Sequence, residues 1–360
     1  MENTRTPILI FFNNDQITSE AKNLNFSYPE EYIFKEKKKI FVFLNHAQKF
    51  DQLQKNHLIF NIGMKLHNFC KKGTFYIDFF GDDHSSIFTL SLGWALMDYS
   101  FDKFKKNKVK KNSPKLAHSH TVEVNKQKKS IFYVRDLINN PANILGPKDL
   151  YLNARNFLAK DFKSKKVIGK KLEEEFPLVS FVGRGSEKNR EPLLCEFTHK
   201  NKKSKKKVIL IGKGVTFDTG GLNLKLGNGM SLMKKDMGGA ANSIGLANLI
   251  SQSSNNFDLV LLLALVENSV SAKSMRPSDI VRSRKGDYIE IGDTDAEGRL
   301  ILADAITYAL ELKPDLIIDL ATLTGASRVA LGTEVPSFFT NDEEIAEKIT
   351  YSSNLVGDPL

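Results

Sequence analysis

The chain has 360 residues, of which 41% are hydrophobic and 26% are charged, a composition typical of a globular protein with room for two domains. No apolar run approaches the about 18–20 residues of a membrane span, and the N-terminal residues lack the pattern of a signal peptide. The two cysteines, Cys70 and Cys195, are too few for a disulfide framework or a zinc cluster. We therefore expect buried thiols and a reducing, cytoplasmic compartment.

The formal net charge of +10 comes mainly from Lys, with 42 Lys against 10 Arg. The lysines gather in runs at 103–115, 125–129 and 199–207. No base-reading motif accompanies these runs, and Lys is a poorer bidentate phosphate ligand than Arg. We interpret the runs as solvated loops and expect neither a membrane nor a nucleic acid as partner, with a nucleic-acid binder kept as one rival hypothesis.

The first hundred residues alternate strand-like and helix-like patterns, which predicts a small α/β domain over residues 1–125. Strands are predicted at 7–12, 39–45 and 74–80, and helices at 51–72 and 86–106. Residues 103–130 are rich in Lys and Asn and contain a Pro, so we predict a linker there.

A second α/β pattern begins at residue 131 and continues to residue 360. Its predicted strands lie at 191–199, 206–214, 259–267, 288–293 and 316–322, and its clearest helices at 240–253 and 299–312. The basic run between the first two strands resembles the turn of a hairpin. Strands that alternate with helices favour a mostly parallel central sheet covered by helices on both faces.

Residues 293–300, with the sequence DTDAEGRL, carry three carboxylates at every second position. In an extended segment Asp293, Asp295 and Glu297 would share one face. The motif also comes close to a calcium-binding loop, with Gly298 at its sixth position and Asp304 at its twelfth. That position should be Glu, however, and the preceding residues are β-like where a helix is required. The pattern instead indicates a loop that enters a helix.

Two other segments place charged side chains at strand ends or helix starts. The first, 212–225, is Gly-rich and carries Lys213, Asp218 and Lys225; alone it could be an ordinary turn after a strand. The second is 230–242, where Asp236 alone would be a helix N-cap. Taken with residues 295–297, these segments supply oxygen donors without Cys or a nearby His. Such donors suit a pair of Mn, Mg or Zn ions that activates one water and polarises a carbonyl.

Four motifs resemble the signature segments of the leucyl aminopeptidase (cytosol aminopeptidase) family. They are GKGVTFDTGG, MKKDMGGAA, TDAEGRLILADA and DLATLTGA, and they occur in the family's order. Residues 266–300 are most similar to the alphaproteobacterial forms. The resemblance covers about 131 to 360, so it identifies this region with the family's catalytic α/β domain, and it implies hydrolysis of N-terminal residues from peptides with a Leu-type preference.

The resemblance also implies a site with two divalent ions, Mn or Zn by preference and Mg or Co as alternatives. Their ligands would be Lys213, Asp218, Asp236, Asp295 and Glu297. Of these, Asp218, Asp295 and Glu297 would hold the tighter ion. Lys213 would have to be deprotonated, and two adjacent dications would depress its pKa.

The same resemblance assigns the remaining site residues. Lys225 would stabilise an oxyanion, and Arg299 would hold a bicarbonate or a water as proton acceptor. The unprotonated amine of the substrate would bind one ion and Asp236. The substrate would be lined by Met233, Thr322, Leu323 and Gly325.

The chain departs from the family pattern in three ways. Asp293 stands where Asn is usual, and the added charge would tighten the metals or raise a neighbouring pKa. Ser231 replaces a frequent Asp. Family members also run over a hundred residues further, so we expect an incomplete catalytic domain. The intact protein would be a cytoplasmic homo-hexamer that acts on peptides. The alternative is a truncated, inactive member that serves as a binding or scaffold protein.

Overall fold

The computed structural model describes residues 5–11, 31–36, 38–44, 50–80, 86–106 and 113–360. Contacts divide the chain into two compact units, one of Met1–Lys129 with Gly325–Leu360 and one of Ser130–Thr324. None of the helices in the described ranges is both long and apolar enough to cross a membrane.

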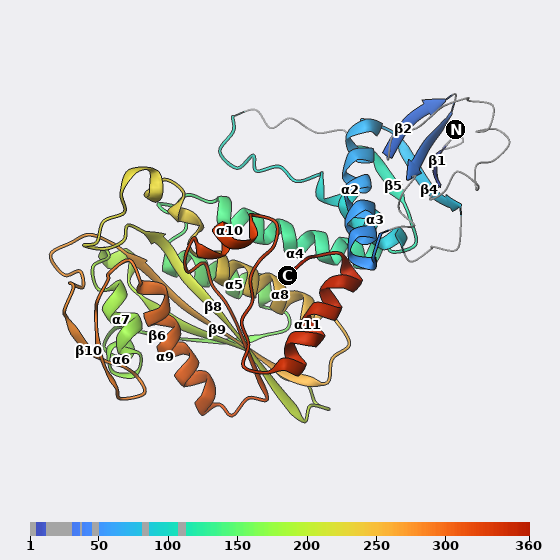
Figure 1. Ribbon diagram of the computed structural model, residues 1–360. Coiled ribbons are helices and arrows are strands. Elements are labelled where there is room, and N and C mark those ends of the chain that lie inside the picture. The colour runs from blue at the N-terminus through green and yellow to red at the C-terminus, as the bar shows by residue number, and fades with distance from the viewer. Residues whose placement is uncertain (1–4, 12–30, 37, 45–49, 81–85, 107–112) are drawn as a thin grey trace. The chain divides into compact units, whose positions relative to one another are not determined.

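The first unit contains a five-stranded sheet in the order β2-β3-β1-β4-β5. Its strands belong to the N-terminal part of the chain, coloured blue to cyan in Figure 1. Its strands are β1 (Thr6–Phe11), β2 (Glu31–Glu36), β3 (Lys39–Leu44), β4 (Thr74–Phe80) and β5 (Lys115–Ala117). All neighbouring strands are parallel except β2 and β3. The strands predicted at 7–12, 39–45 and 74–80 are confirmed, although residues 12 and 45 lie outside the described residues.

The helices of this unit pack mainly through α2 (Gln52–Cys70) and α3 (Ser86–Leu96). A capping box between Asp51 and Gln54 starts α2 close to its predicted position. The helix predicted at 86–106 is too long, because Asp98 leaves the helical pattern to contact Lys128 and His67. Two C-terminal helices, α10 (Ala326–Leu331) and α11 (Glu343–Val356), also belong to this unit.

The predicted linker at 103–130 contains regular structure. Besides β5, it includes the start of α4 (Thr121–Asn139), while residues 107–112 lie outside the described residues. The lysine run at 125–129 therefore lies on a helix and not in a loop. Burial of Val124, Ser130 and Leu137 stabilises this helix through packing.

The second unit is built on a sheet with the order β12-β8-β9-β7-β6. Its strands are β6 (Lys163–Ile168), β7 (Leu193–His199), β8 (Lys206–Asp218), β9 (Phe257–Asn268) and β12 (Leu316–Leu320). The neighbours β12, β8 and β9 are parallel, whereas β7 is antiparallel to both β9 and β6. The α/β class is confirmed, with a mixed sheet here and the mostly parallel sheet in the first unit.

The hairpin predicted between β7 and β8 is wrong, because β9 lies between these strands. The residues 259–266 of β9 are all apolar and buried, so this strand needs neighbours at both edges and helices on both faces. The predicted strand at 288–293 is also placed differently. It forms β11 (Tyr288–Glu290), which pairs with β10 (Ile280–Arg282) in a separate two-stranded sheet.

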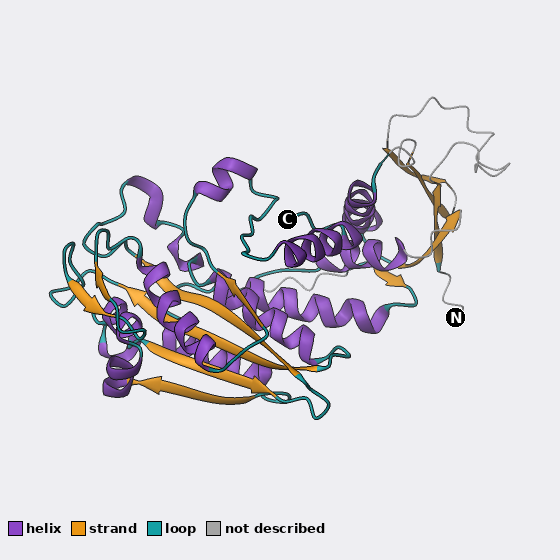
Figure 2. Ribbon diagram, turned by 60° about the horizontal axis from the view of Figure 1, so that its bottom comes forward, coloured by secondary structure: helices purple, strands orange, loops and turns teal. Residues whose placement is uncertain are grey.

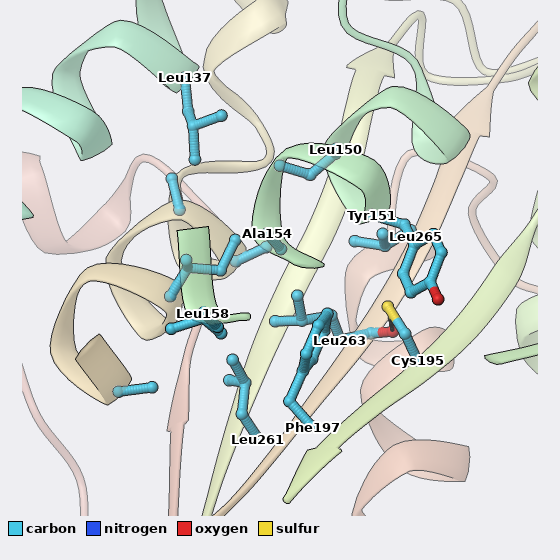
Figure 3. Packing of buried hydrophobic residues seen from close by; sticks show 14 of the residues in the cluster. Leu137, Leu150, Tyr151, Ala154, Leu158, Cys195, Phe197, Leu261, Leu263 and Leu265 are labelled. Atoms are coloured by element: carbon cyan, nitrogen blue, oxygen red, sulfur yellow. Dashed lines mark hydrogen bonds between the residues drawn. The ribbon is translucent and has the colours of Figure 1, made fainter. Parts of the chain in front are cut away.

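Helices cover both faces of the second sheet, as predicted (Figure 2). One face packs Leu261, Leu263 and Leu265 against α5 (Pro147–Leu158) and α8 (Gly238–Ser251), and Figure 3 shows this cluster around Phe197. The alternate residues of β9 face α6 (Gly169–Glu175), α7 (Pro177–Gly183) and α9 (Glu297–Glu311). Successive side chains of β9 thus pack alternately against the helices on the two faces of the sheet. This packing fixes the helices relative to the carboxyl ends of the parallel strands, where α/β proteins place their sites.

Candidate metal centre

The charged residues of the three sequence motifs converge at the carboxyl end of the parallel strands. Lys213 and Asp218 belong to the last part of β8. Asp236 follows the short 3₁₀ helix Met233–Lys235 and precedes α8, and Glu297 is the first residue of α9. Open α/β sheets place their sites at this edge, so the arrangement agrees with the predicted location.

Three buried carboxylates form the centre of the cluster. Asp218, Asp236 and Glu297 each offer one oxygen, and these oxygens lie within 4.8 Å of one another. Burial raises the pKa of Glu297 to about 7; the nearby charge of Lys213 opposes the rise, and those of Asp218 and Asp236 add to it. Like charges this close require a proton or a cation among them.

Lys213 supplies a cation from within the protein. Its Nζ lies 2.8 Å from Asp236 Oδ2 and 3.0 Å from Glu297 Oε1, and it donates to the Thr322 carbonyl oxygen at 2.5 Å. Burial lowers the pKa of Lys213, but the two carboxylates outweigh burial and raise it. The depressed pKa that the family resemblance implies would therefore have to come from bound dications.

The donor set fits a divalent ion. Within the described part of the chain, Glu297 Oε2 is buried without a hydrogen-bond partner. Asp236 Oδ2 also lacks a hydrogen bond of acceptable geometry, although the Lys213 ammonium lies nearby. Buried carboxylate oxygens with unused acceptor capacity are costly, and a hard cation would satisfy them. These are the oxygens that we expect to face an ion.

A second cation, Lys225, lies beside the cluster. Its Nζ is 2.8 Å from Asp218 Oδ2 and 2.5 Å from Asp295 Oδ1. Burial lowers the pKa of Lys225, but hydrogen bonds to these two carboxylates outweigh it and raise the pKa, so the ammonium stays charged. Asp295 is half-buried and lies next to Asp218, outside the group of three carboxylates whose oxygens converge.

The structure shows the local contacts of the two residues that depart from the family pattern. Asp293 is exposed, and its Oδ1 accepts the backbone N–H of Asp295 at 2.8 Å. An Asn side chain offers the same acceptor, so this turn accommodates either residue. Ser231 is also exposed, and its hydroxyl donates to the Asn228 carbonyl oxygen at 2.7 Å.

The other predicted site residues are spread around the cluster. Thr322 donates its hydroxyl to Asp236 Oδ1 at 2.8 Å, and Leu323 is half-exposed beside it. Met233 is half-buried in the 3₁₀ helix before Asp236. Arg299 lies in the first turn of α9, exposed, and its side chain makes no hydrogen bond or ion pair with any described residue. Gly325 caps α10 and is assigned to the other compact unit.

Sequence reasoning missed three residues that join the segments of the cluster: Asn223, Asn268 and Thr294. All three make buried or half-buried hydrogen bonds between the segment after β8 and the loop before α9. One signal was available, because Asn268 is the last residue of β9, two residues beyond its apolar run, and it pairs with Asp218. A polar residue at the carboxyl end of a parallel strand is expected to contact the functional site.

Fold and site together define an α/β protein with a buried acidic centre suited to divalent ions. The chain belongs to the cytosol aminopeptidase family, since the family's catalytic-domain model matches residues 132–360. This family is the one that the four sequence motifs indicated.

Probable cytosol aminopeptidases from two bacteria illustrate the relationship. The protein from Aquifex aeolicus is 40% identical over 228 residues, which cover 63% of this chain and 46% of the relative. An alphaproteobacterial protein, from Brucella anthropi, is 38% identical over 288 residues, covering 75% and 58%. The chain thus spans about half the length of the curated relatives it matches.

Solved structures show the same fold. The cytosol aminopeptidase of Coxiella burnetii is 33% identical and superimposes with a TM-score of 0.86, covering 100% of this chain and 80% of the other. The bottromycin maturation enzyme BotP, solved in complex with Mn, is 24% identical with a TM-score of 0.84, covering 99% and 81%. The second likeness is one of fold alone.

Proposed function

We propose that this chain carries the catalytic site of a metal-dependent aminopeptidase that removes N-terminal residues from peptides. The observation that carries the proposal is the convergence of Asp218, Asp236 and Glu297 around Lys213. A purely structural ion pair would leave no buried carboxylate oxygen without a partner, whereas Glu297 Oε2 has none among the described residues. Membership of the cytosol aminopeptidase family supports the same reading.

Five residues would hold two divalent ions: Lys213, Asp218, Asp236, Asp295 and Glu297. Mn or Zn is the preferred identity, with Mg and Co as alternatives, because amine and carboxylate donors accept all four. When bound, such ions lower the pKa of a water and polarise a carbonyl group.

The chain's own residues would do the remaining work. Lys225, held charged by Asp218 and Asp295, would stabilise negative charge that develops on the carbonyl oxygen of the scissile bond. Arg299 has its guanidinium unused by the described residues, so it would hold bicarbonate or water as the proton acceptor. Asp236 would accept an N–H of the unprotonated substrate amine, which would make the enzyme select the N-terminus of a peptide.

The substrate side chain would contact apolar surface near the cluster. Leu323 is 50% exposed directly after Thr322, whose hydroxyl is bound to Asp236. Met233 lies three residues before Asp236 and is half-buried. By family resemblance, Gly325 would complete this contact. Apolar surface here would favour a Leu-type residue at the N-terminus.

Assembly and location follow from the family resemblance alone. The substrates would be peptides, the full-length protein would be a homo-hexamer, and its compartment would be the cytoplasm. The alternative is an inactive member of the family that acts as a binding or scaffold protein.

The test is hydrolysis of Leu-p-nitroanilide by the purified chain. We expect release of p-nitroaniline that requires added Mn²⁺ and stops with a chelator. N-acetyl-Leu-p-nitroanilide, which lacks the free amine, should not be hydrolysed. Folded protein that releases no product with Mn²⁺ would overturn the enzyme reading and favour the scaffold alternative.

A further inference from the structure

Asn268, the last residue of β9, uses its side chain to join two segments of the candidate metal centre. The residue is 1% exposed. Its Nδ2 donates to Asp218 Oδ1 at 2.9 Å and to the Thr294 carbonyl oxygen at 3.0 Å. A carboxamide has two N–H hydrogens, so both are used. One holds the end of β8, and the other holds the loop that leads into α9.

The first of these bonds fixes the orientation of the Asp218 carboxylate. Oδ1 accepts the Asn268 amide and also the backbone N–H of Gly220 at 2.9 Å. Two donors fill the capacity of that oxygen within the carboxylate plane. Oδ2 is therefore the oxygen that pairs with Lys225, at 2.8 Å, and its second lone pair remains available to an ion.

The second bond fixes the loop that carries the other carboxylates. Thr294 is fully buried, and its hydroxyl donates to the Gly220 carbonyl oxygen at 2.6 Å and accepts the Asn223 N–H at 2.8 Å. Asp295 follows Thr294 directly, and Glu297 comes two residues later. A shift of the Thr294 carbonyl would move both carboxylates relative to Asp218.

We infer that Asn268 is a positioning residue: its carboxamide holds the two ligand-bearing segments, one at Asp218 and one at Thr294, at the separation needed to share divalent ions. This inference rests on the proposed function, because it concerns ion binding by the same residues. Loss of a hydrogen-bond partner that orients a metal ligand typically lowers metal affinity by about 10–100-fold. Asn268 would not touch the ion or the substrate.

The experiment is a titration of the purified chain with Mn²⁺, in which free Mn²⁺ is measured by electron paramagnetic resonance. Asn268→Leu keeps a similar volume and removes both donors. A matched control is Asn248→Leu, because Asn248 is also a buried amide, on α8, that donates to Ser130 Oγ at 2.8 Å. Thermal unfolding of each variant shows what each lost hydrogen bond costs the fold.

We expect Asn268→Leu to weaken Mn²⁺ binding by about 10–100-fold, and Asn248→Leu to leave it within about twofold. Should Asn268→Leu fail to fold, Asn268→Ser, which leaves more room, replaces it with the same expectation. Equal Mn²⁺ affinity in wild type and a folded Asn268 variant would overturn the inference. So would equal losses in the Asn268 and Asn248 variants, or failure of both Asn268 variants to fold while Asn248→Leu folds. Absence of Mn²⁺ binding by the wild type would instead overturn the proposed function.

Discussion

Gly298 leaves the space that the Lys213 side chain occupies. A Cβ atom placed on Gly298 would lie 2.6 Å from Lys213 Cε and 2.8 Å from its Nζ. The absence of that atom lets the first turn of α9 approach β8, so that Glu297 Oε1 reaches 3.0 Å from the ammonium. The sequence pattern indicated only that Gly298 lies where a loop enters a helix; the structure shows that it also makes room for Lys213 in the site.

Gly298→Ala should displace Lys213 and weaken the cluster. The added methyl group meets a fully buried side chain, so we expect a loss of about 1–3 kcal/mol in the free energy of unfolding and weaker Mn²⁺ binding. Gly292→Ala is the control, since a Cβ there meets nothing within 4 Å. Urea unfolding and Mn²⁺ titration of both variants check the prediction. Equal stability and equal Mn²⁺ affinity of the two variants would show that the close approach of Gly298 to Lys213 is not needed for the site.

Lys213→Met should destabilise the chelator-treated protein at pH 8. The buried carboxylates of Asp236 and Glu297 would lose their counter-charge, which costs about 3–5 kcal/mol when one partner of a buried pair is removed. Lys200→Met is the comparison, because Lys200 is 67% exposed in its pair with Asp258 and should cost less than about 1 kcal/mol. Urea unfolding followed by circular dichroism gives both values. Similar losses in the two variants would contradict the buried role of Lys213.

Acid should remove the contribution that ionised Asp98 makes to the stability of the first unit. Burial raises the pKa of Asp98, but hydrogen bonds from Lys128, Ser113 and His67 outweigh it, so the pKa is lowered. A carboxyl group whose pKa is lowered by folding stabilises the folded state at pH values above its unfolded pKa of about 3.9. This stabilisation is lost as the pH falls through the pKa of the folded state.

Asp98→Asn should therefore be less stable than wild type at pH 7, and the difference should vanish toward pH 2. Trp94 is the one tryptophan of the chain, and its ring centroid lies 5.6 Å from that of His67, which contacts Asp98. Its fluorescence therefore reports the unfolding of this unit. A difference that stays constant from pH 7 to pH 2 would contradict the ionic role of Asp98.

The sequence predicted the types of most elements because their apolar patterns are strong. The continuous apolar run of β9 and the periodic run of α9 both appear where expected. Strand order was harder to predict, since neighbours in sequence need not pair. The basic run at 199–207 resembled a hairpin turn, yet the buried β9 required partners on both edges and took the position between β7 and β8.

The candidate site was predictable to the level of its charged residues. Their positions at strand ends and helix starts predicted one cluster of six residues: Lys213, Asp218, Lys225, Asp236, Asp295 and Glu297. The structure brings Asp218, Asp236 and Glu297 together around Lys213, whereas Lys225 and Asp295 lie beside this group. What spacing could not show was the hydrogen bonding between segments distant in the chain. Asn268 is 50 residues from Asp218, and only the parallel pairing of β8 and β9 sets them side by side.

The most direct measurement is the Mn²⁺-dependent rate of Leu-p-nitroanilide hydrolysis by wild type and Glu297→Gln, purified side by side. Glutamine keeps the size of the side chain and loses the charge that an ion needs. We predict turnover by the wild type, abolished by the substitution while the variant remains folded by circular dichroism. Turnover retained by Glu297→Gln would contradict the assignment of this carboxylate cluster as the catalytic metal centre.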